Sequence, residues 1–454
     1  MKKATFRGGI HLAGHKELTS GRQTIAAKVP DRVYIPLSQH IGAPCAPLVV
    51  VGDLVKKGHT IGMGKGFVSA PVHASVSGKV IAIDIMEHPG GSFVPAIVIE
   101  NNGKEEWAET VQPAGDPATL QPEQIRQIIM EAGIVGLGGA TFPSHVKYAP
   151  VEGKSVQTVI LNGVECEPFL TADHRLMLEK SQRIVAGLGY IMRSVGCNKG
   201  VIAIEDNKMD AVAALKQAAA SVSDITVVVL KEKYPQGSEK QLIYACTGKQ
   251  VPVGGLPLAV GVIVNNVGTA AAVADAVEHG IPLIERYVTV SGPGIRNPAN
   301  YLVRIGTLFS ELIAQSGGCN GEVEKIIAGG PMMGKTVFSD QLPVVKGTSG
   351  IVVICKETQQ QSKEFPCVRC AKCIDACPAF LEPTSLVRMA KRSAWEQAEE
   401  SDVMSCIECS SCVYACPAHI PLIQYIRRAK QAVLAAKAKK ESRSRLKPPF
   451  MVTP

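Results

Sequence analysis

The stretch that decides the fold runs from Cys367 to Pro417 and contains one cysteine pattern twice. The first copy reads CVRCAKCIDACP (367–378) and the second reads CIECSSCVYACP (406–417), so both follow the spacing C-x2-C-x2-C-x3-C-P. This spacing is typical of two [4Fe–4S] clusters in which the last cysteine of each run binds the other cluster. We therefore predict two sets of ligands, which are Cys367, Cys370, Cys373 and Cys416 for the first cluster and Cys406, Cys409, Cys412 and Cys377 for the second.

Two other roles for these cysteines fit the spacing less well. Zinc sites take their ligands in two pairs set well apart, whereas three cysteines within seven residues suit the corner of a cubane cluster. A disulfide framework is disfavoured because no secretory signal precedes the cysteines. The six other cysteines are scattered, and we expect them to be reduced core or loop residues: Cys45, Cys166, Cys197, Cys246, Cys319 and Cys355.

The length and charge of the chain limit the number of domains and the kinds of partner that we expect. The chain of 454 residues corresponds to about three domains, and no apolar run reaches the ~20 residues of a membrane span. Met1–Gly9 has no apolar segment behind it and is not a signal peptide, so we expect a cytosolic protein that reaches a membrane through a partner. Much of the net charge of +8 lies between Arg427 and Lys447. This segment lacks interleaved aromatic residues, which argues against nucleic acid and leaves either a docking tail or a solvated helix.

The N-terminal quarter of the chain has a β pattern. Residues 1–30 are polar and glycine-rich and indicate an extended arm, whereas residues 31–105 predict a compact all-β module. Its expected strands lie at 32–37, 47–51, 78–83 and 95–100. The segments 51–62 and 70–80 resemble the biotinyl/lipoyl barrel-sandwich family, but no Met-Lys-Met motif is present, so we expect a structural module.

A linker at 101–120 leads to a predicted helix over 121–132, which has a proline near its start and Gly133 just past its end. The next residues, GIVGLGGATFPSHVK (133–147), form a glycine-dense loop that closes on Lys147. Glycines allow backbone N–H groups to face a phosphate, and a lysine adds a positive charge. A tight packing turn is the alternative interpretation.

The residues after this loop alternate between β and α patterns, which predicts a doubly wound α/β domain over 120–280. A buried strand at 157–161 is followed by Asn162, and polar residues at the carboxyl ends of strands bind ligands in such sheets. The alternation continues with a helix at 180–195, a strand at 200–204, a helix at 210–220 and a strand at 225–230.

Short strand patterns return over 285–355 and predict a small β-grasp-like module. Within it, the loop GGPMMG (329–334) is interpreted as a turn, with a contact to a partner as the alternative. A ferredoxin domain over 360–425 would contain both cysteine runs, bridged by a helix around 383–400. A basic tail would occupy 426–454, which makes the fold class multidomain α/β.

Four motifs in this order resemble the FMN- and NADH-binding subunit of respiratory complex I. They are the glycine loop with its Phe-Pro, the Asn-x-x-Glu-x-Glu-Pro segment (162–168), the Tyr-x-x-Gly-x-Glu segment (234–239) and Val-Asn-Asn-Val (264–267). In that family an SLBB-like β-grasp module and an iron–sulfur domain follow. The N-terminal barrel-sandwich module and the two complete ferredoxin runs are instead similar to the C-subunit family of the Rnf (Rsx) ion-translocating NADH–ferredoxin oxidoreductases.

This resemblance implies binding residues at matching positions of the motifs. The FMN phosphate and ribityl chain would contact Gly136, Gly138, Gly139 and Lys147, and the flavin would be lined by Asn162, Glu165, Asn265 and Asn266. Contacts to NADH would come from Phe142, Glu167, Tyr234, Gly237 and Glu239. The sequence departs from the complex I pattern at Val164, which replaces an aspartate, and at Ser238 and Gly268, which each replace a glutamate. The segment 249–260 also lacks an aromatic residue that would stack on adenine.

The resemblance further implies a peripheral subunit on the cytoplasmic face of the cell membrane that exchanges electrons between NAD(H), FMN and two [4Fe–4S] clusters. Its expected partners are membrane-embedded and ferredoxin-like subunits of the same complex. A flavin belongs between nicotinamide and clusters because it exchanges electrons both in pairs and singly. Two alternatives stay open, namely a non-catalytic electron-transfer adaptor that binds neither flavin nor nucleotide, and a soluble bifurcating dehydrogenase subunit.

Overall fold

Two small β-sheets pack against each other in the first module of the computed structural model, which describes residues 4–358 and 363–445, with side chains as far as Lys440. One sheet consists of β2 (Arg32–Pro36), β8 (Phe93–Asn101), β7 (Gly78–Glu87) and β4 (Leu54–Val55), and the other of β3 (Cys45–Pro47), β5 (Thr60–Gly64) and β6 (Val72–His73). Val33, Ile35, Ile97 and Ile99 are fully buried between them.

The strand expected at 47–51 is wrong beyond Pro47. The Val50 amide donates to the Asp53 carboxylate at 2.8 Å, so a turn takes the hydrogen bond that a neighbouring strand would need. Val50 and Val51 are therefore exposed.

The second module contains a four-stranded parallel sheet in the order β11-β10-β9-β12. Its strands are β9 (Thr158–Asn162), β10 (Gly200–Glu205), β11 (Ile225–Leu230) and β12 (Val262–Asn266). The strand order reverses between β9 and β12, and Asn162 lies directly opposite Asn266 in their register. Open α/β sheets bind ligands outside the carboxyl ends of their strands at such a reversal.

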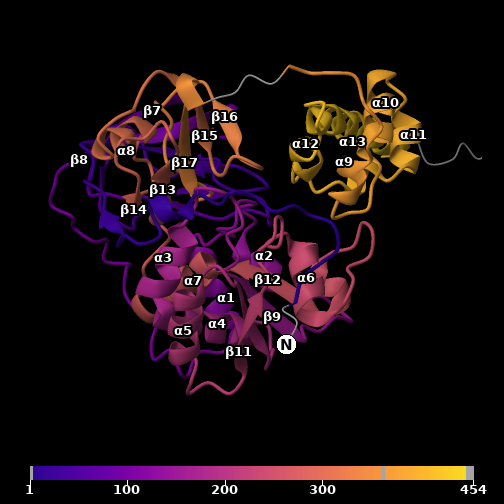
Figure 1. Ribbon diagram of the computed structural model, residues 1–454. Helices are drawn as coiled ribbons and strands as arrows, with labels where there is room; N and C mark the ends of the chain where they lie inside the picture. The colour runs from indigo at the N-terminus through magenta and orange to yellow at the C-terminus, as the bar shows by residue number, and fades with distance from the viewer. Residues whose placement is uncertain (1–3, 359–362, 446–454) are drawn as a thin grey trace, which may run out of the picture.

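Helices cover both faces of this sheet (Figure 1). The helices are α1 (Pro122–Glu131), α2 (Ser144–Tyr148), α3 (Ala172–Glu179), α4 (Ser181–Ser194), α5 (Met209–Ala218), α6 (Glu239–Thr247) and α7 (Val267–His279). Val159 and Leu161 pack with α1, α4, α5 and α7, whereas the intervening Ile160 packs with Leu242 of α6. This alternation follows from the two-residue period of a strand and accounts for the three consecutive apolar residues at the centre of β9.

The third module is a six-stranded sheet in the order β1-β14-β13-β17-β15-β16 with one helix, α8 (Phe309–Gln315). Its strands are β1 (Ile25–Ala26), β13 (Glu285–Ser291), β14 (Ala299–Arg304), β15 (Val323–Ala328), β16 (Lys335–Val337) and β17 (Gly350–Cys355). Because β1 pairs in parallel with β14, the expected N-terminal arm supplies an edge strand to a distant module, with Ile25 opposite Tyr301.

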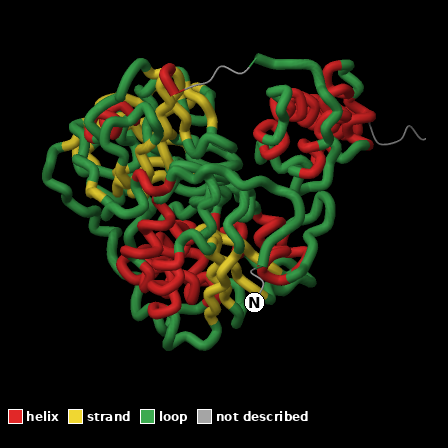
Figure 2. Tube along the Cα trace, in the orientation of Figure 1, coloured by secondary structure: helices red, strands yellow, loops and turns green. Residues whose placement is uncertain are grey.

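The fourth module is helical, as Figure 2 shows. It contains α9 (Lys372–Asp375), α10 (Pro383–Lys391), α11 (Trp395–Glu400), α12 (Ser411–Tyr414) and α13 (Leu422–Arg445). The single helix expected around 383–400 is wrong, because Ser393 has a left-handed backbone (φ 54°) and separates α10 from α11.

Helix α13 crosses the boundary that was expected between the ferredoxin domain and a basic tail. Ile426, Ala429 and Val433 are buried in the core of the helical module, so the first turns of that tail belong to the module. The last part of the expected tail, 446–454, lies outside the described residues, as does the start of the expected ferredoxin domain at 360–362. Nowhere in the described chain is a helix both long and apolar enough to cross a membrane.

Candidate functional site

The two cysteine runs fold into the same local structure. Their helices, α9 with α10 and α12 with α13, start at equal offsets from Cys367 and Cys406. Left-handed residues also recur at equal offsets: Arg369 with Glu408, and Ala371 with Ser410 (φ 56°, 58°, 61° and 62°). Non-glycine residues adopt this conformation at a cost, and such strain concentrates at ligand-binding loops.

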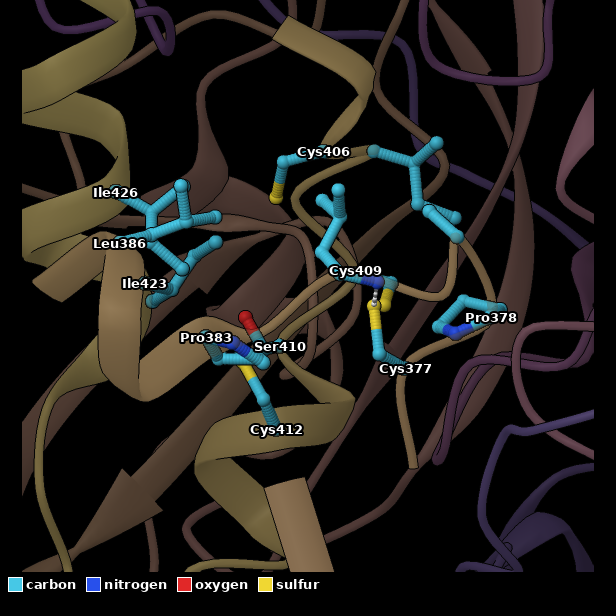
Figure 3. A pocket seen from close by; sticks show the side chains of 13 residues that line it. Cys377, Pro378, Pro383, Leu386, Cys406, Cys409, Ser410, Cys412, Ile423 and Ile426 are labelled. Atoms are coloured by element: carbon cyan, nitrogen blue, oxygen red, sulfur yellow. Dashed lines mark hydrogen bonds between the residues drawn. The ribbon is translucent and has the colours of Figure 1, made fainter. Parts of the chain in front are cut away.

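The predicted second set of cysteines surrounds one hollow, shown in Figure 3. Cys377 comes from the first run and Cys406, Cys409 and Cys412 from the second. Apolar side chains, including Leu386, line the same hollow. The Leu381 amide donates to Cys377 Sγ at 3.4 Å, an interaction that stabilises a ligating thiolate. Thiol ligands in an apolar shell fit an iron–sulfur cluster.

The predicted first set lies nearer the surface. Cys367 and Cys370 are exposed, whereas Cys373 is buried and Cys416 is half-buried. Burial raises the pKa of the Cys373 thiol, and the nearby thiols of Cys416 and Cys367 act in the same direction. The effect of Cys416 on Cys373 is compatible with the crossed pattern, and the assignment of the first set stays a prediction.

None of the fourteen cysteines, all of which lie within the described residues, forms a disulfide. No group of three or more histidine, cysteine, aspartate or glutamate side chains in the described chain is spaced to hold a single metal ion.

The strand reversal in the α/β sheet gathers three of the predicted flavin residues. Asn162 Nδ2 donates to Gly237 O at 2.9 Å, and Asn266 Nδ2 donates to Asp173 Oδ2 at 2.6 Å. Asn265 accepts a hydrogen bond from Tyr148 Oη at 2.8 Å, but its buried Nδ2 has no partner. An unsatisfied buried donor is costly unless a ligand or water accepts from it, so the site fits a polar cofactor such as a flavin.

The glycine loop lies beside these asparagines. Its centre is held by Leu137, whose amide donates to Thr269 Oγ1 at 2.9 Å and whose carbonyl accepts from the buried Arg286 guanidinium. Gly138 and Gly139 are exposed. Gly139 has φ 102°, a conformation that other residues rarely adopt, and a side chain there would meet open space. The loop therefore presents bare backbone, which suits the close approach of a phosphorylated cofactor.

Lys147 adds a cation at the same place. Its Nζ donates to Val264 O at 2.6 Å and lies 3.6 Å from Glu239 Oε1. Burial lowers the pKa of Lys147. Phe142 also belongs to the loop, since its carbonyl accepts from the Gly136 amide at 2.9 Å.

The two glutamates of the Asn-x-x-Glu-x-Glu-Pro motif are both engaged by protein groups. Glu165 accepts from the amides of Asp173 and His174 at 2.8 and 3.1 Å and thereby caps α3. Glu167 accepts from the amides of Met332 and Met333, each at 2.9 Å. The loop GGPMMG, which we interpreted as a turn, therefore closes on a residue predicted to contact NADH. Burial raises the pKa of Glu167.

Tyr234 lies beside these glutamates. Its hydroxyl is buried near Glu167 but makes no hydrogen bond of normal geometry. Burial raises the pKa of the Tyr234 phenol, and the Glu167 carboxylate acts in the same direction. The hydroxyl is a second unsatisfied polar group at the site.

Two residues near the site were missed by the sequence analysis. Lys16 of the arm donates to three carbonyls of the glutamate segment, those of Glu165, Glu167 and Leu170, at 2.6–2.9 Å. Its partners are about 150 residues away, so no local pattern indicates it. Asp173 lies in α3, shortly after the glutamate motif in the sequence. This closeness to the motif was the only sequence feature that could have indicated a place for Asp173 at the site.

The raised pKa of the Asp173 carboxyl group predicts how the stability of the protein depends on pH. Burial, followed by the charge of Glu165, raises its pKa from 3.8 to about 7, against the opposing effects of Asn266, Arg286 and Lys208. Between pH 3.8 and about pH 7, Asp173 holds a proton in the folded chain that it has lost in the unfolded chain. The free energy of unfolding therefore falls as pH rises through this range. In Asp173→Asn we expect the thermal unfolding temperature of flavin-free protein to decline less from pH 5 to 8 than in the wild type.

Part of the decline should remain in this variant, because burial also raises the pKa of Glu205 to about 7. The exposed Asp116→Asn is the control and should keep the full wild-type decline. Equal declines in Asp173→Asn and the wild type would contradict the prediction.

Comparison with known proteins finds matches along most of the chain. Four family models match successive segments: the RnfC barrel sandwich hybrid domain over 4–104, the Nuo51 FMN-binding domain over 129–275, the SLBB domain over 287–336 and the 4Fe-4S dicluster domain over 361–417. The expected fold class is therefore confirmed. FMN and [4Fe–4S] clusters are likewise confirmed as its cofactors, whereas the assignment of individual residues to them stays a prediction.

Relatives that match over most of their length are C subunits of ion-translocating complexes. The C subunit of the Na(+)-translocating ferredoxin:NAD(+) oxidoreductase complex of Acetobacterium woodii is 47% identical over 402 residues, which are 88% of this chain and 91% of the relative. The proton-translocating counterpart from Clostridium ljungdahlii is 48% identical over 87% of this chain and 86% of its own. The C subunit of the ion-translocating oxidoreductase complex of Rhodobacter capsulatus is 42% identical over 85% of this chain and 75% of its own.

Proposed function

This chain belongs to the family of C subunits of ion-translocating oxidoreductase complexes, and we propose that it is the subunit that exchanges electrons with NAD(H). Electrons would pass between NAD(H), a bound FMN and the two clusters, and from there to or from membrane-embedded and ferredoxin-like subunits. The chain would be a peripheral subunit on the cytoplasmic side of the membrane.

The observation that carries this proposal is the position of helix α6 between the two cofactor sites. Glu239 at its start lies 3.6 Å from Lys147 in the flavin site. Two residues later, the buried Gln241 Nε2 donates to Pro378 O at 3.1 Å, next to the predicted cluster ligand Cys377. A single turn of helix thus contacts both predicted sites, which supports electron transfer between them.

The residues of the chain position the cofactors and tune them. The glycine loop and Lys147 would hold the FMN phosphate, and Asn162 and Asn265 would bind polar atoms of the cofactor. FMN, when bound, exchanges two electrons with nicotinamide and single electrons with clusters. Glu167 would contact NADH only after the loop containing Met332 and Met333 releases its carboxylate.

The burial of the cysteines suggests an order for the two clusters. The second set adjoins α6 at Pro378, the residue after Cys377, whereas the first set includes the exposed Cys367 and Cys370. The second set would therefore be nearer the flavin, and the first would face a redox partner. Helix α13 has fewer unpaired positive side chains for docking than its sequence suggests. Arg427 and Lys430 both form ion pairs with Glu408, at 2.9 and 2.6 Å.

The test is reduction of an artificial one-electron acceptor by NADH, using the purified full-length chain with reconstituted clusters and added FMN. We expect reduction that requires both NADH and FMN. Clusters without bound flavin, and no reaction with NADH, would instead support the non-catalytic adaptor.

A control separates a damaged preparation from an inactive protein. Dithionite should reduce the clusters of the same sample whether or not NADH does. A sample that responds to dithionite but not to NADH would count against the proposed function.

A further inference from the structure

The N-terminal arm runs along the edge of the α/β domain to the cluster module. Ala4 forms a parallel bridge with Leu230, at the end of β11. Farther along, Ile10 and Tyr234 exchange two backbone hydrogen bonds of 2.9 Å each. Figure 1 shows the indigo arm passing α6 below the cluster module. The arm is thus attached to the segment that carries Tyr234, one of the residues predicted to contact NADH.

Between these two attachment points, Gly8 and Gly9 contact the cluster module. The Gly9 amide donates to Ala376 O at 3.0 Å. A Cβ on Gly8 would lie 2.7 Å from Cys377 O, and a Cβ on Gly9 would lie 2.5 Å from Tyr234 O. Their φ angles are 79° and 76°, which other residues rarely adopt. Only glycine at both positions allows the backbone to fit between Tyr234 and Cys377.

Side chains also fix the arm and the Cys377 segment to the α/β domain. Lys233 Nζ donates to Phe6 O at 3.2 Å and lies 4.8 Å from the centre of the Phe6 ring. On the other side of the contact, Gln241 bonds to Pro378 O. The peptide segment around Cys377 is therefore attached to the α/β domain by two independent contacts, one through the arm and one through α6.

We propose that Gly8 and Gly9 are positioning residues for electron transfer between the flavin and the second cluster. They hold the Cys377 segment against the α/β domain and thereby set the separation of the two redox sites. The inference rests on the proposed function. Oxidation of one NADH to NAD+ releases one proton to solvent and two electrons, and one-electron reduction of each cluster accounts for both electrons.

Gly8→Ala and Gly9→Ala test the role in the full chain with FMN and clusters bound. The matched control is Gly21→Ala on the same arm, where φ is ordinary and a Cβ would meet nothing within 4 Å. Anaerobic stopped-flow mixing with NADH follows flavin and cluster absorbance separately. We expect cluster reduction slowed by about tenfold in both variants, because alanine disfavours the docked backbone. Flavin reduction should keep the wild-type rate in Gly8→Ala, because a Cβ on Gly8 would meet Cys377 and Pro378 and not Tyr234.

Hydrogen exchange gives a readout that does not depend on activity. In both variants, residues 374–380 should exchange faster than in Gly21→Ala, because the Gly9–Ala376 contact is weakened. If a glycine variant does not fold, Gln241→Met, which removes the second contact, should slow cluster reduction in the same way.

Unchanged cluster reduction together with faster exchange at 374–380 would overturn the proposal. Unchanged exchange would also overturn it, since the arm would then not hold the segment. Failure of the proposed function looks different, because NADH would then fail to reduce the flavin even in the wild type.

Discussion

Cys377→Ser should eliminate the cluster whose other three ligands come from the opposite cysteine run. Cys377 lines the same hollow as Cys406, Cys409 and Cys412, so its loss opens that coordination sphere and leaves the first set intact. We expect the iron content to fall from about eight to about four atoms per chain. Iron analysis measures the loss, and electron paramagnetic resonance of the dithionite-reduced protein should show one cluster instead of two interacting clusters.

Double variants make this test decisive. If the crossed assignment is right, Cys377→Ser combined with Cys406→Ser loses no more iron than either change alone, whereas Cys377→Ser combined with Cys367→Ser loses nearly all of it. The opposite result would mean that each run binds its own cluster. Cys319→Ser, at a half-buried position outside both runs, is the control and should keep its full iron content.

Lys147→Met should weaken FMN binding about 10- to 100-fold, because a hydrogen bond to a charged group contributes about 1.5–3 kcal/mol. The lysine is the cation of the glycine loop, and methionine keeps the length of the side chain while removing the charge. Quenching of FMN fluorescence by flavin-free protein gives the dissociation constant.

The control for this prediction is Lys154→Met, an exposed lysine in the turn after α2. Lys147 also donates to Val264 O, so thermal unfolding must show that the variant remains folded. A folded Lys147→Met protein that binds FMN as tightly as Lys154→Met would mean that the cation does not contact the phosphate.

The sequence predicted accurately those helices and strands that depend on a local pattern of apolar and polar residues. The strand expected at 225–230 is found as β11 with the same bounds, and α4 and β10 differ from expectation by a single residue at their ends. Apolar runs of this length between helical patterns have few alternatives. Elements that depend on single backbone conformations were missed, as at Ser393, where one left-handed residue divides a helix that the sequence pattern continues.

At the candidate site, too, the sequence indicated the residues that belong to local motifs but not the contacts between distant segments. The motifs indicated which residues lie around the strand reversal, and the structure brings Asn162, Asn265 and Asn266 together there. The motifs did not indicate that Glu167 is held by the amides of Met332 and Met333. These partners are separated by about 165 residues, and neither segment carries a pattern that refers to the other.

The sequence by itself determined the cluster chemistry, because the spacing of thiols along a short loop decides what those thiols bind. It also determined the alternation of strands and helices, which depends on residues within one element. Only the tertiary structure decided that Gly9 would contact Ala376 and that Gln241 would contact Pro378. Such contacts depend on how finished modules pack against one another, and that packing is a property of surfaces assembled from distant parts of the chain.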